Sequence, residues 1–235
     1  MGTSPIARRL IGELRTAIGE RGDPLRAAQQ QRYMKSTIPY RGLSSAELRS
    51  VVKPILDQHR LPTPQEWATA IGHLWAEVQF REEWYAALAL ARHRFYRTWA
   101  RSVDAIEVYE QMIRRGRWWD VCDELAAHLV GGVLASHPQD LTAMMRLWAV
   151  DDEMWIRRCS ILAQLRRRDD TDRELLATCI AGSLSDRDFF ARKAIGWALR
   201  EFSKTDPSWV RNYVAVHERQ LSSLSKREAL RLIDP

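Results

Sequence analysis

The sequence predicts an all-α protein, and three observations support that fold class. Apolar residues recur at spacings of three and four in one segment after another, which is the pattern of an amphipathic helix. Glycine is scarce, and the alternating apolar and polar pattern of a β-strand is absent. Turn-forming stretches divide the chain into pieces of helical length at residues 21–23, 39–45, 61–64, 114–117, 136–140, 167–172 and 204–207.

Several of these turns end in a residue that is suited to begin a helix. Ser45 precedes an apolar repeat, and Thr63 and Asp206 are each followed by a proline, which favours the first helical position. Near the C-terminus, Ser225 is followed three residues later by Glu228, which is the spacing of a capping box. We expect helices to begin at these positions.

The helical segments recur along the chain. Prominent residues stand about 35 to 40 residues apart, from Trp84 to Trp119, from Asp123 to Arg158 and from Arg158 to Trp197. This period is typical of helical-pair repeats that stack into an α-solenoid, whose inner helices share one concave face. We predict about six such pairs.

The composition favours a globular protein with a polyanionic partner. Of the 235 residues 46% are apolar, which is ample for a packed core. No linker divides residues 1–235, so we expect a single domain, with an ordinary amphipathic helix over residues 1–25. The formal charge is +6 and the isoelectric point about 9.5, and arginine supplies most of the positive charge.

The sequence lacks the signals of several other classes of protein. No stretch approaches the roughly 18 apolar residues of a membrane span, and the first residues lack a secretory signal, so we expect a cytoplasmic protein. Cys122, Cys159 and Cys179 are scattered, and we expect them to be reduced core residues. The six histidines form no metal-binding pair, and no glycine-rich phosphate loop is present. We therefore expect no metal site.

Two charged residues fall where a plain core is expected. In segment 118–129, Trp119 and Asp123 lie one turn apart beside the apolar stripe, where a carboxylate is partly desolvated. In segment 154–166, Arg158 falls within the apolar stripe, so it must be paired or must project into a cleft. If these helices are equivalent, both residues face one groove. A structural ion pair and a carboxylate that serves a reaction both stay open as interpretations.

Segment 188–207 carries a tryptophan in a row of cations. Its apolar face, which we expect in the core, holds Ala191, Ile195, Ala198, Leu199 and Phe202. Its roughly opposite face holds Lys193, Trp197, Arg200 and Lys204. Cations interleaved with an exposed aromatic side chain are typical of a nucleic-acid surface, where they neutralise phosphates while the indole packs on sugars or bases.

In order and spacing, five segments resemble those of the AlkD-like alkylpurine DNA glycosylases, which are built of HEAT-like repeats. They are "RYMKSTIPYRGLS", "RRGRWWDVCDEL", "WIRRCSILAQLR", "DFFARKAIGWALREFSKTDPSWV" and "LSKREAL", and the resemblance covers roughly residues 30–233. It implies a base excision repair enzyme that removes N3-methyladenine and N7-methylguanine from double-stranded DNA, and we expect a monomer because a groove that embraces the duplex needs no dimer. It also implies that the enzyme needs no metal or cofactor and works at the nucleoid.

The same resemblance implies roles for individual residues. Asp123 matches the family's catalytic carboxylate, while Trp119 and Trp197 match the two tryptophans that flank the deoxyribose of the lesion. Arg158 matches an arginine placed near the same site. Together with the cation row, it leads us to expect DNA contacts at Arg166, Lys193, Arg200, Lys204 and Tyr33.

Three alternatives stay open at this point. A non-catalytic damage-recognition protein on the same scaffold has no reason to keep Asp123 facing phosphates, which it would repel. A scaffold for protein partners would carry an acidic or apolar concave face, whereas the expected inner helices carry arginine. A self-resistance glycosylase that is dedicated to a bulky natural-product adduct fits the sequence as well as a general repair enzyme does.

Overall fold

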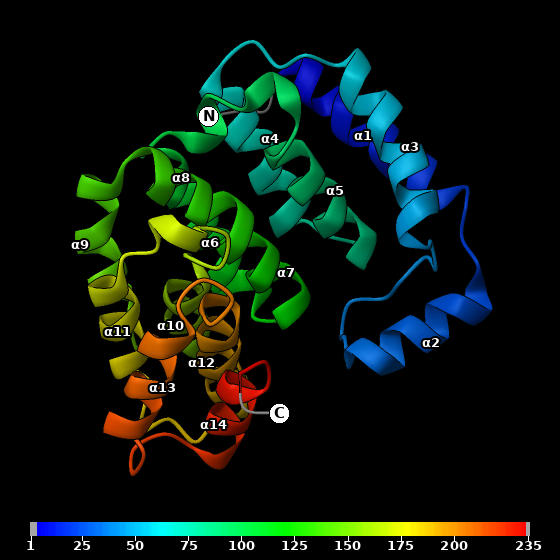
Figure 1. The fold of residues 1–235 in the computed structure, drawn as a ribbon. Coiled ribbons are helices and arrows are strands. Elements are labelled where there is room, and N and C mark those ends of the chain that lie inside the picture. The colour runs from blue at the N-terminus through cyan, green and yellow to red at the C-terminus, as the bar shows by residue number, and fades with distance from the viewer. Residues whose placement is uncertain (1–3, 234–235) are drawn as a thin grey trace. The chain divides into compact units, whose positions relative to one another are not determined.

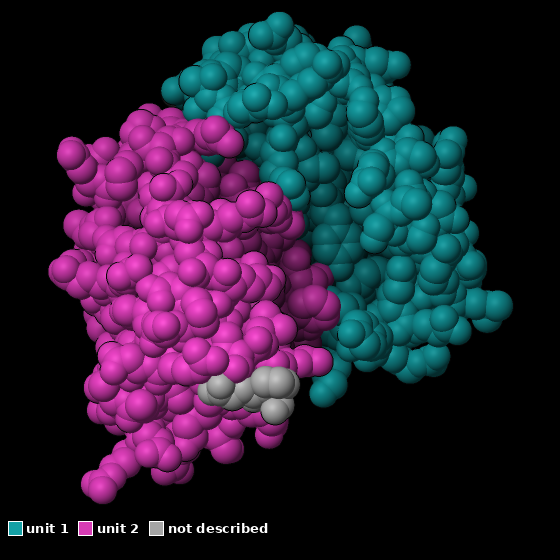
Figure 2. All heavy atoms as spheres, in the orientation of Figure 1, with its two compact units in different colours: residues 1–100 teal, residues 101–235 magenta. Residues whose placement is uncertain are grey.

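The computed structural model describes residues 4–233, and the prediction of an all-α protein is confirmed. Every regular element in that range is a helix, and the range contains no strand. The chain divides into two compact units, residues 1–100 and 101–235, which Figure 2 colours separately. The expectation that both units belong to a single domain stays a prediction.

Among its described residues, 4–100, the first unit contains five α-helices (Figure 1). They are α1 (Pro5–Gly19), α2 (Pro24–Met34), α3 (Ser45–Gln58), α4 (Pro64–Ala76) and α5 (Arg81–Ala91). α1 turns an apolar stripe from Ala7 to Ile18 toward α3, α4 and α5, so that these four helices share one core. The amphipathic helix expected over residues 1–25 is found only over Pro5–Gly19, since the chain leaves the helix at residues 20–23, and residues 1–3 lie outside the described range.

The second helix of this unit is different, because it is polar on nearly all sides. Only Met34 of α2 is buried, while Tyr33 is 76% exposed. Asp23 caps the helix, and the side chain of Gln30 donates to the backbone oxygen of Leu43. α2 is therefore held mainly by polar contacts rather than by an apolar face.

The second unit contains nine α-helices among its described residues. They are α6 (Ala105–Gly116), α7 (Trp119–Glu124), α8 (Gly131–Ser136), α9 (Pro138–Trp148), α10 (Met154–Leu162), α11 (Arg173–Ala181), α12 (Phe189–Phe202), α13 (Pro207–Val216) and α14 (Ser223–Leu230). A π-helical turn, Leu125–Val130, joins α7 to α8, and a 3-10 turn, Arg168–Asp170, precedes α11. α12 packs against both α10 and α14 (Figure 1).

Two of the predicted helix caps are confirmed and two are corrected. Thr63 and Asp206 cap α4 and α13 as expected. α3 is capped by Ser44 rather than Ser45, because Ser44 forms the capping box with the acid three residues later. The predicted capping box at Ser225 is wrong, since α14 begins a turn earlier and its cap is Ser222.

The core of the second unit agrees with the sequence pattern. All five apolar residues that were expected on the inner face of α12 are buried. Cys122, Cys159 and Cys179 are likewise buried and unpaired. None of the described helices is both long and apolar enough to cross a membrane.

Candidate active site

The site is built first on α7, a helix of less than two turns. Trp119 and Asp123 are four residues apart, so both side chains project from the same face of this helix. Both are half-buried, as expected for positions beside the apolar stripe of Val121, Cys122 and Leu125. The π-helical turn follows directly after α7, and π-helical turns occur frequently at functional sites.

Asp123 is held by a two-point ion pair with Arg158 of α10. Nε of Arg158 donates to Oδ1 of Asp123 at 2.7 Å, and Nη2 donates to Oδ2 at 2.8 Å. The Arg158 side chain is only 3% exposed, and that of Asp123 is 16% exposed. Such a paired fork fixes the orientation of the carboxylate more firmly than a single hydrogen bond does.

Arg158 is itself fixed by its surroundings. Its Nη1 donates to the backbone oxygen of Phe190, the second residue of α12. Its guanidinium carbon lies 5.9 Å from the ring centroid of Trp155 and 6.0 Å from that of Phe190. The arginine that falls in the apolar stripe of α10 therefore links α7, α10 and α12 at one point.

Burial has the strongest effect on the Asp123 carboxyl and raises its pKa above the usual value. The Arg158 guanidinium acts in the opposite direction, because it stabilises the ionised form, and the nearby Asp120 adds to the rise. An aspartate whose ionised form depends on one buried partner is a common feature of active sites, although structural pairs show it as well.

A cavity of about 360 Å³ opens beside this carboxylate. Four of the residues singled out in the sequence line it: Trp119, Asp123, Arg166 and Trp197. Trp197 comes from the middle of α12 and is half-buried, whereas its helical neighbours Gly196 and Ala198 are buried. The structure thus brings together two indoles and a carboxylate from two helices that lie far apart in the sequence.

The lining of this cavity is more acidic than the sequence analysis anticipated. Asp120, Glu124 and Glu201 join Asp123 around it, and Arg166 and His128 are the basic residues. Asp120, Glu124 and His128 could have been found from the sequence, because they follow one another at the helical spacing of four residues, beginning three residues before Asp123. Glu201 gives a similar signal, since it follows Trp197 by one turn. The cavity favours a cationic ligand over an anionic one.

The predicted row of Lys193 and Arg200 in α12 and Lys204 just after it is not open, because each of these three cations has a carboxylate partner. Nζ of Lys193 lies 2.7 Å from Oε1 of Glu228, and Arg200 pairs with the other oxygen of the same carboxylate. Nζ of Lys204 lies 2.7 Å from Glu201. Glu228 thus forms ion pairs with cations of α12 rather than capping its own helix. These long-range pairs are not visible in the local spacing of the sequence.

The remaining predicted residues lie at the edges of this arrangement or in the other unit. Arg166 lies just after α10 and is exposed where it lines the cavity. Tyr33 belongs to α2 of the first unit, where its ring is exposed. The roles assigned to Arg166, Tyr33 and the cations of α12 as DNA contacts stay predictions. The part of the chain that the structure describes holds no group of three or more side chains arranged to bind a metal.

Comparisons with known proteins agree on one family. The family model described as DNA alkylation repair enzyme matches residues 14–233. A solved structure described as a predicted DNA alkylation repair enzyme from Enterococcus faecalis is 27% identical, with a TM-score of 0.81, over 91% of this chain and 97% of that one. No curated protein matches the sequence.

A second solved structure shows the same helical-repeat fold at greater distance. It is described as the Pseudomonas fluorescens alkylpurine DNA glycosylase AlkC bound to DNA containing an abasic site analog. The two chains are 14% identical with a TM-score of 0.53, over 96% of this chain and 61% of that one.

Proposed function

Because the chain belongs to the DNA alkylation repair enzyme family, we propose that it is a monofunctional DNA glycosylase for cationic alkylated purines in duplex DNA. The observation that carries the proposal is one cavity in which Asp123 lies with Trp119 and Trp197. The proposed substrates are N3-methyladenine and N7-methylguanine, and a bulky adduct at either atom is a further candidate.

The chemistry of these lesions explains what the site needs to supply. Alkylation at N3 or N7 places a positive charge on the purine, which makes the base a good leaving group without a proton from the enzyme. The remaining barrier is cleavage of the bond between the sugar C1′ and the base nitrogen, through a sugar with oxocarbenium character. A site for this reaction needs an anion and a water molecule rather than a general acid.

Asp123 is the group that fits this need. Its carboxylate would stabilise the positive charge that develops on the sugar, and it could orient or deprotonate the attacking water. The two hydrogen bonds from Arg158 orient the carboxylate and favour its ionised form before the substrate arrives. The acidic lining from Asp120, Glu124 and Glu201 favours a cationic purine over a neutral one.

The two indoles would bind the lesion nucleotide between α7 and α12. The faces of Trp119 and Trp197 attract a developing cation and exclude bulk water from C1′. On the same helix, Lys193 and Arg200 share the single carboxylate of Glu228, so this cluster keeps a net positive charge for a phosphate. The sequence interpretation of α12 as a DNA-facing helix thus fits the proposal.

A non-catalytic damage-recognition protein is the second candidate, and one observation favours it. Asp123 already has a buried partner in Arg158, as a purely structural carboxylate would. Such a protein would bind alkylated duplex and leave the glycosidic bond intact.

Base release separates the two candidates. The purified protein is incubated without metal, in the presence of a chelator, with a duplex that contains a single N7-methylguanine. The proposal predicts free N7-methylguanine and an abasic site, with no release from the undamaged duplex. Binding without release from this lesion, from N3-methyladenine and from a bulky N3-adenine adduct would favour the recognition protein.

A further inference from the structure

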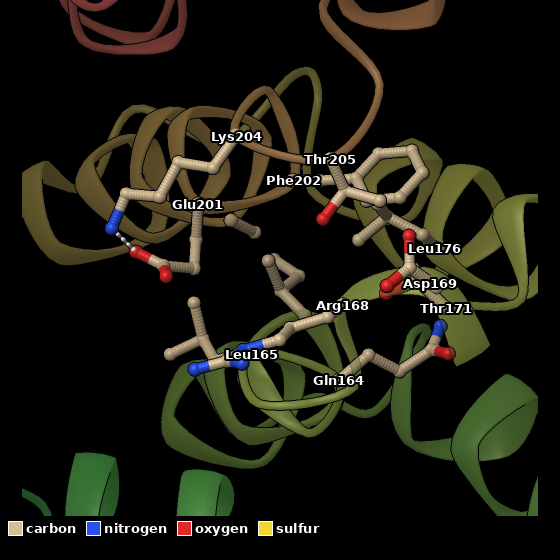
Figure 3. Close-up of a pocket in the computed structure, with 12 residues that line it drawn as sticks. Gln164, Leu165, Arg168, Asp169, Thr171, Leu176, Glu201, Phe202, Lys204 and Thr205 are labelled. Carbon is tan, nitrogen blue, oxygen red and sulfur yellow. Dashed lines mark hydrogen bonds and ion pairs between the residues drawn. The ribbon is translucent and has the colours of Figure 1, made fainter.

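A second cavity of about 470 Å³ adjoins the candidate active site (Figure 3). Leu165 and Glu201 line both cavities, so one wall is common to the two. The second cavity lies between the turn after α10 and the C-terminal end of α12, where Arg168 and Lys204 contribute basic side chains. Nothing in the proposed excision step uses these residues.

Arg168 lies in this wall with an unusual backbone conformation. Its φ is +51°, in the left-handed region that non-glycine residues seldom adopt. The turn around it is held in place, because the Arg167 side chain donates twice to the backbone oxygen of Asp170. The amide of Gln164 also exchanges two hydrogen bonds with the backbone of Asp172. Strained residues in well-supported turns often belong to binding sites.

The Arg168 guanidinium has no hydrogen bond or ion pair among the described residues. Figure 3 shows it extending toward Leu165, the side that the two cavities share, whereas the Asp169 carboxylate lies on the Leu176 side. Glu201, the other acid of the cavity, is paired with Lys204 at 2.7 Å. The free positive charge in this cavity is therefore concentrated at its border with the candidate active site.

We propose that Arg168 binds a phosphate of the DNA strand that carries the lesion, next to the nucleotide held between the two indoles. Arg166 lines the first cavity and Arg168 the second, so the turn after α10 presents two arginines along one path. The planar fork of a guanidinium matches phosphate oxygens, and this one has no competing carboxylate bound to it. The inference rests on the proposed function, because the nucleotide bound in the candidate active site defines which strand passes Arg168.

The test uses Arg168→Asn, because asparagine tolerates the left-handed conformation and the turn should fold as before. Each phosphate contact contributes about 0.9 to the slope of log affinity against log salt concentration for duplex DNA. We expect Arg168→Asn to reduce this slope by about that amount, so its deficit in affinity shrinks about threefold between 50 and 200 mM salt. Arg168→Lys should retain most of the slope.

The matched control is Arg219→Asn, which removes an exposed arginine that lines neither cavity. It should leave the slope at the wild-type value. A wild-type slope for Arg168→Asn, with base release intact, would overturn the phosphate contact and leave the proposed function standing. Conversely, a reduced slope for Arg168→Asn, together with no base release by the wild-type protein, would support the phosphate contact and contradict the glycosylase function.

Discussion

Gly196 of α12 lies so close to α14 that a Cβ atom at this position would be 2.5 Å from the Cβ of Glu228. The same atom would be 3.0 Å from the backbone oxygen of Ser225, so the obstacle includes main chain that cannot rotate away. This close approach allows Glu228 to reach Lys193 and Arg200 on either side of Trp197. A glycine at the centre of the proposed DNA-facing helix therefore sets the position of its charges.

Replacing this glycine should be harmful although alanine is the better helix former. We expect Gly196→Ala to lower the free energy of unfolding by about 1–3 kcal/mol through overpacking, and to weaken excision by displacing α14. The control is Gly12→Ala in α1, where a Cβ meets nothing within 4 Å. This substitution should raise the free energy of unfolding by about 0.5–1 kcal/mol, because alanine is the better helix former. Chemical denaturation measures the free energy of unfolding of both variants, and equal effects of the two substitutions would show that the close approach of α12 to α14 does not limit this position.

The ion pairs of Glu228 should make stability depend on pH. Its hydrogen bond with Lys193, followed by the charges of Lys193 and Arg200, lowers the pKa of the Glu228 carboxyl below its usual 4.5. This contribution to stability is present above pH 4.5 and is lost as the pH falls through the lowered pKa. Glu228→Gln should therefore be less stable than wild type at pH 7, and the two should converge in acid. A difference in unfolding free energy that stays constant from pH 7 to pH 3 would exclude this pairing.

Arg158 should determine the pH below which excision slows. Burial already raises the pKa of Asp123, and Arg158 opposes that rise. In Arg158→Met the opposing cation is gone, so the pKa of Asp123 should rise further. The reaction needs the ionised carboxylate. As the pH is lowered, the single-turnover excision rate of the variant should therefore begin to fall at a higher pH than that of wild type. An unchanged profile at a uniformly lower rate would show that Arg158 acts through packing alone.

The indole of α12 offers a separate test of the lesion-binding face. Trp197→Ala should reduce single-turnover excision by at least about tenfold, because it removes the aromatic face beside the developing cation. Trp197→Phe retains a smaller face and should lie between alanine and wild type. Thermal unfolding of both variants checks that α12 is intact. Wild-type binding and excision by Trp197→Ala would refute the assignment of this face.

Much of the fold could be predicted from the sequence because helix signals are local. The apolar spacing of Ala191, Ile195 and Leu199 identified the buried face of α12, and proline after Thr63 and Asp206 marked two helix starts. The π-helical turn after α7 could not be predicted, since its apolar spacing resembles that of an ordinary helix.

The candidate site was predicted in its residue types but not in its pairings. The mismatch of Asp123 and Arg158 with their apolar stripes signalled that each needed a partner, yet only the fold shows that they pair with each other. Glu228 was assigned to a local cap because three-residue spacing is visible in sequence, whereas its contacts with α12 are not. Long-range ion pairs depend on packing between helices, which sequence periodicity does not specify.

If the Asp123 carboxylate drives excision, removing its charge in Asp123→Asn should abolish most of the activity. The amide keeps the size of the side chain and removes its charge, so duplex binding should be retained. The measurement is the single-turnover rate of N7-methylguanine release at saturating protein. We expect a loss of about 100- to 1,000-fold in rate, with an unchanged or tighter complex. A variant that releases the base at the wild-type rate would contradict this role of the carboxylate.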